Sequence, residues 1–349
     1  MRINKNPKRS KLRSIELSSS NKRGFEFSFS WIFAFIAGAM IIFLAVYAAN
    51  RLVSTNDFVE QAKRGKEIGI LLNPIETNLE GAKYTRIIVP EETTIFNGCE
   101  NSGIFGKQKI SVALKSSINE EEKESAGVES SFKNKYLFSR KSIKSKKEFY
   151  VLSKPFKFPF KIGDIMIMWG DKEEYCFVNA PEDIKKELND SLKLDMVSFS
   201  RTSEKCASGS KKVCFPPRGE NCDIEVSFNS KSISFNEDNK TVYFTYFDDS
   251  DKYSLLYAGI FSDPEVYECQ IKRLMGRASE LSSLYEDKSV YLQQQKCGSA
   301  NLIGDLESYR AESKSMVNDD SSLRIKDDNF NSLVIQLEEK NAKLICKLF

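Results

Sequence analysis

The side chains that usually carry acid–base chemistry are thinly represented in this chain. It contains no histidine, so the commonest general base and metal ligand is missing. Catalysis would have to use serine with lysine, or paired carboxylates, and neither occurs at a distinctive spacing. The densest acidic run, DDSD at 248–251, lacks the glycine and the final Glu of an EF-hand loop and is interpreted as a solvated turn. The sequence therefore predicts no enzymatic activity, no cofactor and no metal site.

Cysteine is the other reactive residue type. Eight are present, and all of them follow an uncharged apolar run at 27–49. They are Cys99, Cys176, Cys206, Cys214, Cys222, Cys269, Cys297 and Cys346. An even number suits disulfides in an oxidising compartment, and the absence of any CxxC pair argues against zinc; buried free thiols are the alternative.

One disulfide is expected from local sequence. Cys214 and Cys222 flank a loop with two prolines and a glycine, between two strand-like segments, so we expect them to be bonded across a hairpin. Cys269 could pair with Cys297 across a bent helical hairpin, and Cys206 or Cys346 could instead take either partner.

The run from Phe27 to Ala49 determines where the protein works. It is uncharged and long enough to cross a bilayer as a helix. Residues 1–23 carry eight Lys or Arg and a single Glu, which predicts a cytoplasmic leader (1–26), a transmembrane helix (27–49) and an extracytoplasmic remainder. A cleaved signal peptide is the alternative, although its apolar region would be shorter.

The charge balance argues against a nucleic-acid partner. The formal net charge is +3, but the leader supplies all of the positive excess, and the remaining chain has four more acidic than basic residues. No basic footprint for nucleic acid is left there. The leader is interpreted as a topology signal near lipid head groups.

Hydrophobic periodicity divides the remainder into three parts. A helical stalk and linker cover 50–83, and one helix is expected to run from about Phe27 to Leu72, before Pro74. An antiparallel β-rich domain follows at 84–261, with SLLYAG at 254–259 among its strands, Gly103–Lys107 as a hairpin turn and a mobile charged loop at 116–147.

The third part is a C-terminal helical unit at 262–349. We expect Ser262 as an N-cap, with Pro264 in the first turn and Glu265 three residues after the cap. Helical stripes then recur up to Leu348, and a coiled-coil arm is the alternative to a packed unit. The fold class predicted is α+β.

Small residues line one face of the apolar helix. Glu26, Ser30, Ala34 and Gly38 are spaced by four and share that face, which would permit close helix–helix approach in lipid. Self-association through this face is one interpretation. The other is that Glu26 lies among head groups and the small residues are accidental.

The N-terminus resembles a known signal. Lys22-Arg23-Gly24 followed by Phe25-Glu26 and a long apolar helix resembles the class III signal peptide of type IV pilin-like proteins. The resemblance implies cleavage between Gly24 and Phe25 and packing of the helix in a filament or pseudopilus. The family carries its Glu at the fifth mature position, whereas Glu26 would be the second. The whole chain also resembles a set of archaeal single-pass proteins, which implies a fold plan and no activity.

Three hypotheses follow. The first is a membrane-anchored extracytoplasmic protein with a structural or interaction role. Its expected partners are membrane lipid and, through the transmembrane helix, either a second copy of the chain or another membrane protein. The second is a processed pilin-like subunit, and the third, most distant, is a surface hydrolase.

Overall fold

The computed structural model describes the chain in segments that fall into two compact units, Met1–Thr55 and Asn56–Phe349. The described residues are 29–71, 83–114, 128–194, 196–217, 221–246, 252–295, 302–318, 325 and 327–349. They form a mixed α/β protein with an N-terminal apolar helix and three sheets.

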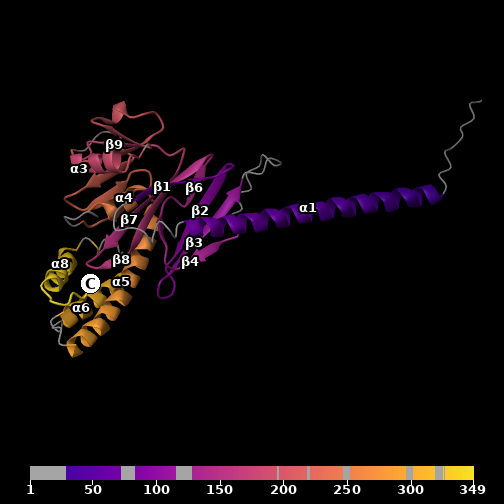
Figure 1. Ribbon diagram of the computed structural model, residues 1–349. Coiled ribbons are helices and arrows are strands. Elements are labelled where there is room, and N and C mark those ends of the chain that lie inside the picture. Colours follow the sequence, from indigo (N-terminus) through magenta and orange to yellow (C-terminus); the bar gives the residue numbers. More distant parts are fainter. Residues whose placement is uncertain are drawn as a thin grey trace, which may run out of the picture. The chain divides into compact units, whose positions relative to one another are not determined.

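The first element is one continuous helix, α1 (Phe29–Leu71), of 43 residues. Its bounds agree with the helix expected from Phe27 to Leu72. In the second unit its last turns pack against strands β3 (Lys107–Leu114) and β4 (Ser130–Phe132), where Ile68 is buried (Figure 1). A Cβ on Gly69 would lie 2.0 Å from the Phe132 ring, so this contact requires glycine.

The central layer is a four-stranded sheet in the order β1 (Lys83–Ile88), β7 (Glu148–Lys157), β8 (Lys161–Gly170), β5 (Tyr136–Phe138). Its long strands β7 and β8 are buried on both faces, because alternate side chains enter two different cores. Ile165, Ile167 and Trp169 point to the larger core, while Met166 and Met168 point to the smaller one. Burial on both faces explains why β8 reads as an unbroken apolar run.

A second four-stranded sheet covers the smaller core. Its order is β4, β3, β2 (Thr93–Glu100), β6 (Ser142–Ser145), and every pair is antiparallel. The β2–β3 connection contains Gly103 and Gly106, both with positive φ, so the expected hairpin turn is confirmed.

The third sheet has six strands. Their order is β10 (Val197–Ser200), β9 (Tyr175–Val178), β11 (Lys211–Cys214), β12 (Ile224–Ser227), β13 (Ser232–Phe235), β14 (Lys240–Tyr243). The first four run parallel, and only the last two pairings are antiparallel. The helix α3 (Glu182–Lys185) and the π-helix η1 (Lys186–Ser191) form the crossover between β9 and β10.

Four helices close the larger core against the central and six-stranded sheets. They are α4 (Ser254–Ile260), α5 (Pro264–Gln294), α6 (Ile303–Met316) and α8 (Asp328–Ala342). Figure 1 shows α5 running alongside β8, with α6 and α8 beyond it. Aromatic contacts connect these helices to the central sheet. Phe158, which follows β7, packs edge-on against Phe330 of α8 with ring centres 5.1 Å apart. Trp169 of β8 stacks on Phe261, which follows α4, also at 5.1 Å.

The expectation of an antiparallel β-rich domain holds for the sheet over the smaller core and for part of the other two sheets. Strands β9 to β12 pair in parallel because the helical crossover and the loops between them return the chain to the same edge of the sheet. Strand β5 also runs parallel to β8. The alternation of apolar and polar residues indicates which face of a strand is buried, but it does not indicate whether the strand runs parallel or antiparallel to its neighbours.

Three further expectations were corrected. SLLYAG is the helix α4, buried along its whole length, and uniform burial removed the 3.6-residue period that marks a helix. Within 116–147, the described residues 128–147 contain β4, β5 and β6 and bury Lys135 to Phe138, so that part is ordered structure. The N-cap of α5 is Asp263, and Ser262 Oγ instead donates to the Ala258 carbonyl.

Candidate functional site

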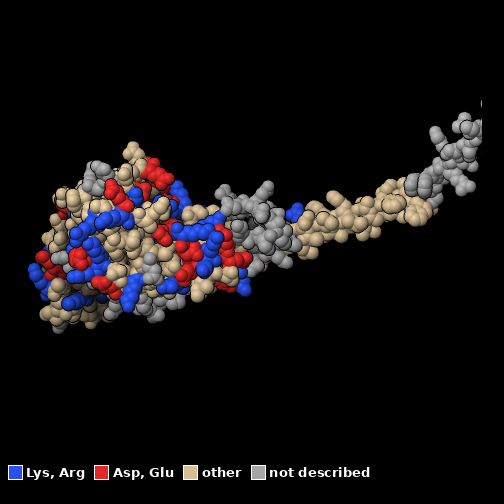
Figure 2. Space-filling model, turned by 90° about the horizontal axis from the view of Figure 1, so that it is seen from above, with Lys and Arg blue, Asp and Glu red and all other residues tan. Residues whose placement is uncertain are grey.

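The apolar part of α1 is the first candidate surface. Phe29–Leu52 is long and apolar enough to cross a membrane, and none of it is buried within the protein. Trp31 and Tyr47 lie 16 positions apart, and Arg51 Nε donates to the Tyr47 hydroxyl at 3.4 Å. No charged residue occurs between Phe29 and Asn50, whereas Figure 2 shows Lys or Arg and Asp or Glu interspersed over the second unit.

The predicted helix-packing face lies partly in this segment. Ser30, Ala34 and Gly38 are in α1, and a Cβ on Gly38 would meet nothing within 4 Å. Glu26 and the cleavage positions Gly24 and Phe25 lie outside the described residues, as do the rest of the basic leader and the acidic run at 248–251.

Disulfides brace the second unit. Cys214 and Cys222 are bonded, which is the pairing expected from the local loop. Cys176 is bonded to Cys206, and these four sulfurs lie on the face of the six-stranded sheet opposite the larger core.

The remaining pairings could not be inferred from spacing. Cys269 is bonded to Cys99, so the suggested bridge from Cys269 to Cys297 was wrong. The alternative of Cys206 or Cys346 as the partner of Cys269 is excluded by the same bond. Cys346 is itself disulfide-bonded.

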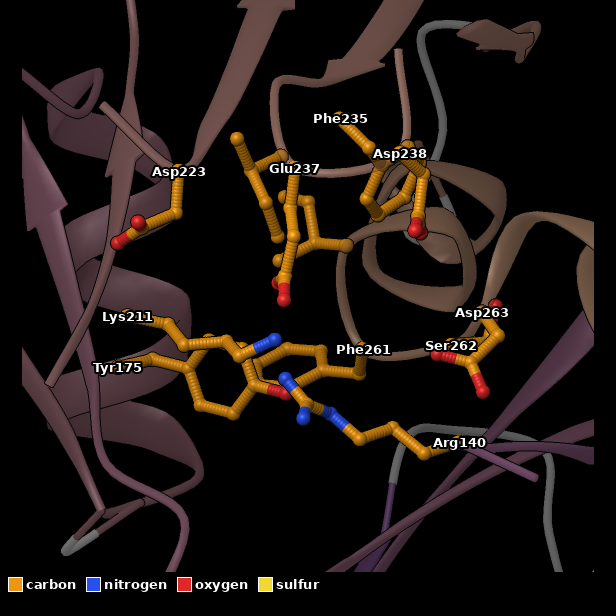
Figure 3. A pocket seen from close by; sticks show the side chains of 12 residues that line it. Arg140, Tyr175, Lys211, Asp223, Phe235, Glu237, Asp238, Phe261, Ser262 and Asp263 are labelled. Atoms are coloured by element: carbon orange, nitrogen blue, oxygen red, sulfur yellow. The ribbon is translucent and has the colours of Figure 1, made fainter. Parts of the chain in front are cut away.

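A pocket of about 210 Å³ opens at the edge of the six-stranded sheet where β9, β11 and β12 begin (Figure 3). Its buried floor consists of Tyr175, Ile224, Ile260 and Phe261. The remaining lining residues are Arg140, Lys211, Asp223, Phe235, Glu237, Asp238, Ser262 and Asp263. Side chains from six separate segments of sequence therefore meet in one cavity.

Two cations and a phenol form one wall. Lys211 is the first residue of β11, Tyr175 is the first of β9, and Arg140 follows β5. In Figure 3 the ends of Lys211 and Arg140 point toward each other beside the Tyr175 ring. Arg140 Nε lies 3.5 Å from Glu173 Oε2, and the Tyr175 hydroxyl donates to the same oxygen at 3.3 Å.

Burial shifts the pKa values of Glu173 and Tyr175 in this wall. It raises the pKa of the Glu173 carboxyl above its ordinary value, while Arg140 and the bond from Tyr175 oppose the rise. Burial and the Glu173 charge together raise the pKa of Tyr175. The phenol therefore remains a neutral donor at neutral pH.

Carboxylates form the opposite rim. Glu237 and Asp238 are exposed in the β13–β14 turn, and Glu237 points in Figure 3 toward Lys211. Asp223 and Asp263 are held by backbone donors, since each Oδ2 accepts an N–H at 2.7 Å, from Lys212 and from Lys141.

A second buried polar group lies between β7 and η1. The Lys154 side chain is fully buried and is hydrogen-bonded to the Glu187 carboxylate, which also accepts the Tyr257 hydroxyl at 2.7 Å. The Lys154 ammonium lies 5.1 Å from the centre of the Tyr257 ring. Because these groups satisfy one another's charges and hydrogen bonds, we interpret the cluster as a structural contact that holds η1 against the central sheet.

None of these lining residues was expected from the sequence to form a ligand site, and Ser262 was expected only as an N-cap. They are common residue types scattered from 140 to 263, and no local spacing links them. The acidic turn at 237–238, next to the first residues of strands, was the only local signal available. Among the described residues, no group of three or more Cys, Asp or Glu is arranged to hold a metal ion.

Comparison with protein family models, with curated proteins and with solved structures finds no match for the chain.

Proposed function

We propose that the protein is a membrane-anchored extracytoplasmic protein with a structural or binding role. The observation that carries the proposal is the continuity of α1, which begins as an uncharged span and ends packed in a disulfide-braced head. The head is here the unit Asn56–Phe349. The apolar end of this helix suits lipid, and its other end belongs to a folded domain.

Charge and redox chemistry support one orientation of the chain in the membrane. The basic leader favours the cytoplasmic side, which leaves the head on the opposite side. The disulfides of the head, three of which join two described cysteines, suit an oxidising exterior, because thiols are kept reduced in most cytosols.

Interfacial side chains fit the same placement. Trp31 and Tyr47 are separated by about 24 Å along the helix axis, within a hydrocarbon core of roughly 30 Å. Arg51 beside Tyr47 supplies a cation that can reach the head groups. Membrane lipid is thus the first partner proposed.

Surface labelling tests the proposal. Intact cells are treated with a membrane-impermeant amine reagent, and labelled lysines are mapped by mass spectrometry against lysed cells. We expect labelling of the exposed Lys205 in intact cells, and labelling of Lys5 and Lys8 only after lysis. Labelled leader lysines with an unlabelled head in intact cells would reverse the orientation.

A pilin-like subunit is the second candidate. The long helix ending in a β-containing head favours it, together with the Lys22-Arg23-Gly24 sequence. On this proposal the mature chain starts at Phe25, and Gly24→Leu leaves the leader attached. Detection of leader peptides in the native protein would remove this candidate and retain the simple anchor.

A further inference from the structure

The pocket at the edge of the six-stranded sheet has the size of a metabolite site. Its volume of about 210 Å³ corresponds to roughly seven water molecules, which is less than a drug-sized ligand needs. Its floor is apolar and rigid, because Tyr175 and Phe261 are each 1% exposed and contact each other edge-on at 4.6 Å. Such a floor excludes water from beneath a bound molecule.

The walls carry opposite charges on opposite sides. Lys211 and Arg140 converge beside the Tyr175 hydroxyl and offer several N–H donors. Glu237 and Asp238 face them from the β13–β14 turn and offer acceptors. A simple anion could pair only with the basic wall and would face the acidic rim, whereas a simple cation could pair only with the acidic rim and would face the basic wall.

We propose that this pocket binds a free α-amino acid. Its carboxylate would be held by Lys211 and Arg140, and its ammonium by Glu237 and Asp238. A zwitterion is the ligand that pairs both walls at once, and charge-assisted hydrogen bonds at each end fix its orientation. The apolar floor then contacts the side chain of the ligand. This inference goes beyond the proposed membrane anchoring and does not depend on it.

Ligand screening tests the inference on the full chain in detergent. Each of the twenty protein L-amino acids is added at millimolar concentration, and the thermal unfolding of the head is followed. We expect one or a few of them to raise the melting temperature, because a ligand that binds only the native state stabilises it. The best one is then titrated calorimetrically beside two analogues, the amine without the carboxylate and the acid without the ammonium.

Variants locate the binding. Lys211→Ala and Glu237→Gln should each weaken binding of the amino acid about tenfold or more, since each removes a charge-assisted bond. Lys205→Ala and Glu204→Gln, exposed positions outside the pocket lining, should leave the affinity unchanged. The inference fails if no amino acid binds, if either analogue binds as tightly as the amino acid, or if both pocket variants retain wild-type affinity.

Discussion

Cys99, near the end of strand β2, is bonded to Cys269 in helix α5 across 170 positions of sequence, with their Cα atoms 6.1 Å apart. The next residue, Gln270, donates from Nε2 to Gln108 Oε1 at 2.6 Å and to the Leu137 carbonyl at 3.1 Å. A covalent bond and a buried amide network thus fix α5 to two different sheets at one point. The C-terminal helices and the early strands are therefore parts of one structural unit.

Loop length predicts how much each disulfide stabilises the head. Replacing both cysteines by serine should cost about 5 kcal/mol for Cys99–Cys269, about 3.5 for Cys176–Cys206 and about 2.5 for Cys214–Cys222, following chain entropy. Denaturant unfolding, monitored by the buried Trp169 in a Trp31→Phe background, measures this order. A larger loss from Cys214–Cys222 than from Cys99–Cys269 would contradict it.

The disulfides also show which contacts can be predicted from the sequence. The Cys214–Cys222 pair, the helix α1 and the hairpin at Gly103–Lys107 were predictable because each depends on residues close in sequence. The Cys99–Cys269 bond was not, because only the packing of α5 on β2 brings those residues together.

The candidate pocket shows the same limit. Its residues meet because β9, β11 and β12 run parallel and begin at one edge, and alternation alone could not reveal strand direction. Helix α4 was predicted as a strand for a related reason: it is buried along its whole length, so its sequence has no amphipathic stripe.

Arg273 should be among the most sensitive positions of the head. It is 1% exposed, lies 4.8 Å from the Tyr136 ring centre, and burial lowers its pKa to about 10. It donates to the carbonyls of Phe105, Phe132, Lys133 and Lys135 and to Gln270 Oε1.

Arg273→Met should therefore cost roughly 3–5 kcal/mol of unfolding free energy, because several buried acceptors lose their donor. As a control, Arg310→Met removes a 43% exposed guanidinium that pairs with Glu286, and should cost less than about 1 kcal/mol. Equal losses of unfolding free energy in the two variants, measured by denaturant unfolding, would contradict the stabilisation assigned to the buried hydrogen bonds of Arg273.

Lys154 and Glu187 should behave as a coupled pair. Lys154→Met leaves the partly buried Glu187 carboxylate without its cation and should cost about 3 kcal/mol. The double variant Lys154→Met, Glu187→Met should recover part of that loss, because no uncompensated charge remains. A double-mutant cycle on unfolding free energies measures the coupling, and strict additivity would exclude it.

Glu173 makes the stability of the head depend on pH in a predictable direction. Burial raises its folded-state pKa above the ordinary value of 4.5, so the native state holds a proton that the unfolded state releases. The unfolding free energy should therefore fall as the pH rises from about 4.5 through the raised pKa. The Glu173→Gln variant lacks this titrating carboxyl. The unfolding free energy of the wild type minus that of the variant should therefore decrease as the pH rises through the same range. Parallel pH profiles of the melting temperature would contradict this assignment.

The small-residue face of α1 predicts self-association in membranes. Gly38 has open space around its Cβ direction, so Leu at this position does not disturb the monomer, and Ala34→Leu with Gly38→Leu changes only what a neighbouring helix meets. We expect the double variant to reduce dimer crosslinking in membranes several-fold, because larger side chains separate the helix backbones. Ala39→Leu, about 120° around the helix from that face, is the matched control and should crosslink like the wild type. The thermal unfolding of the head should be the same in all three proteins. Undiminished crosslinking of the double variant would show that these residues do not form the contact.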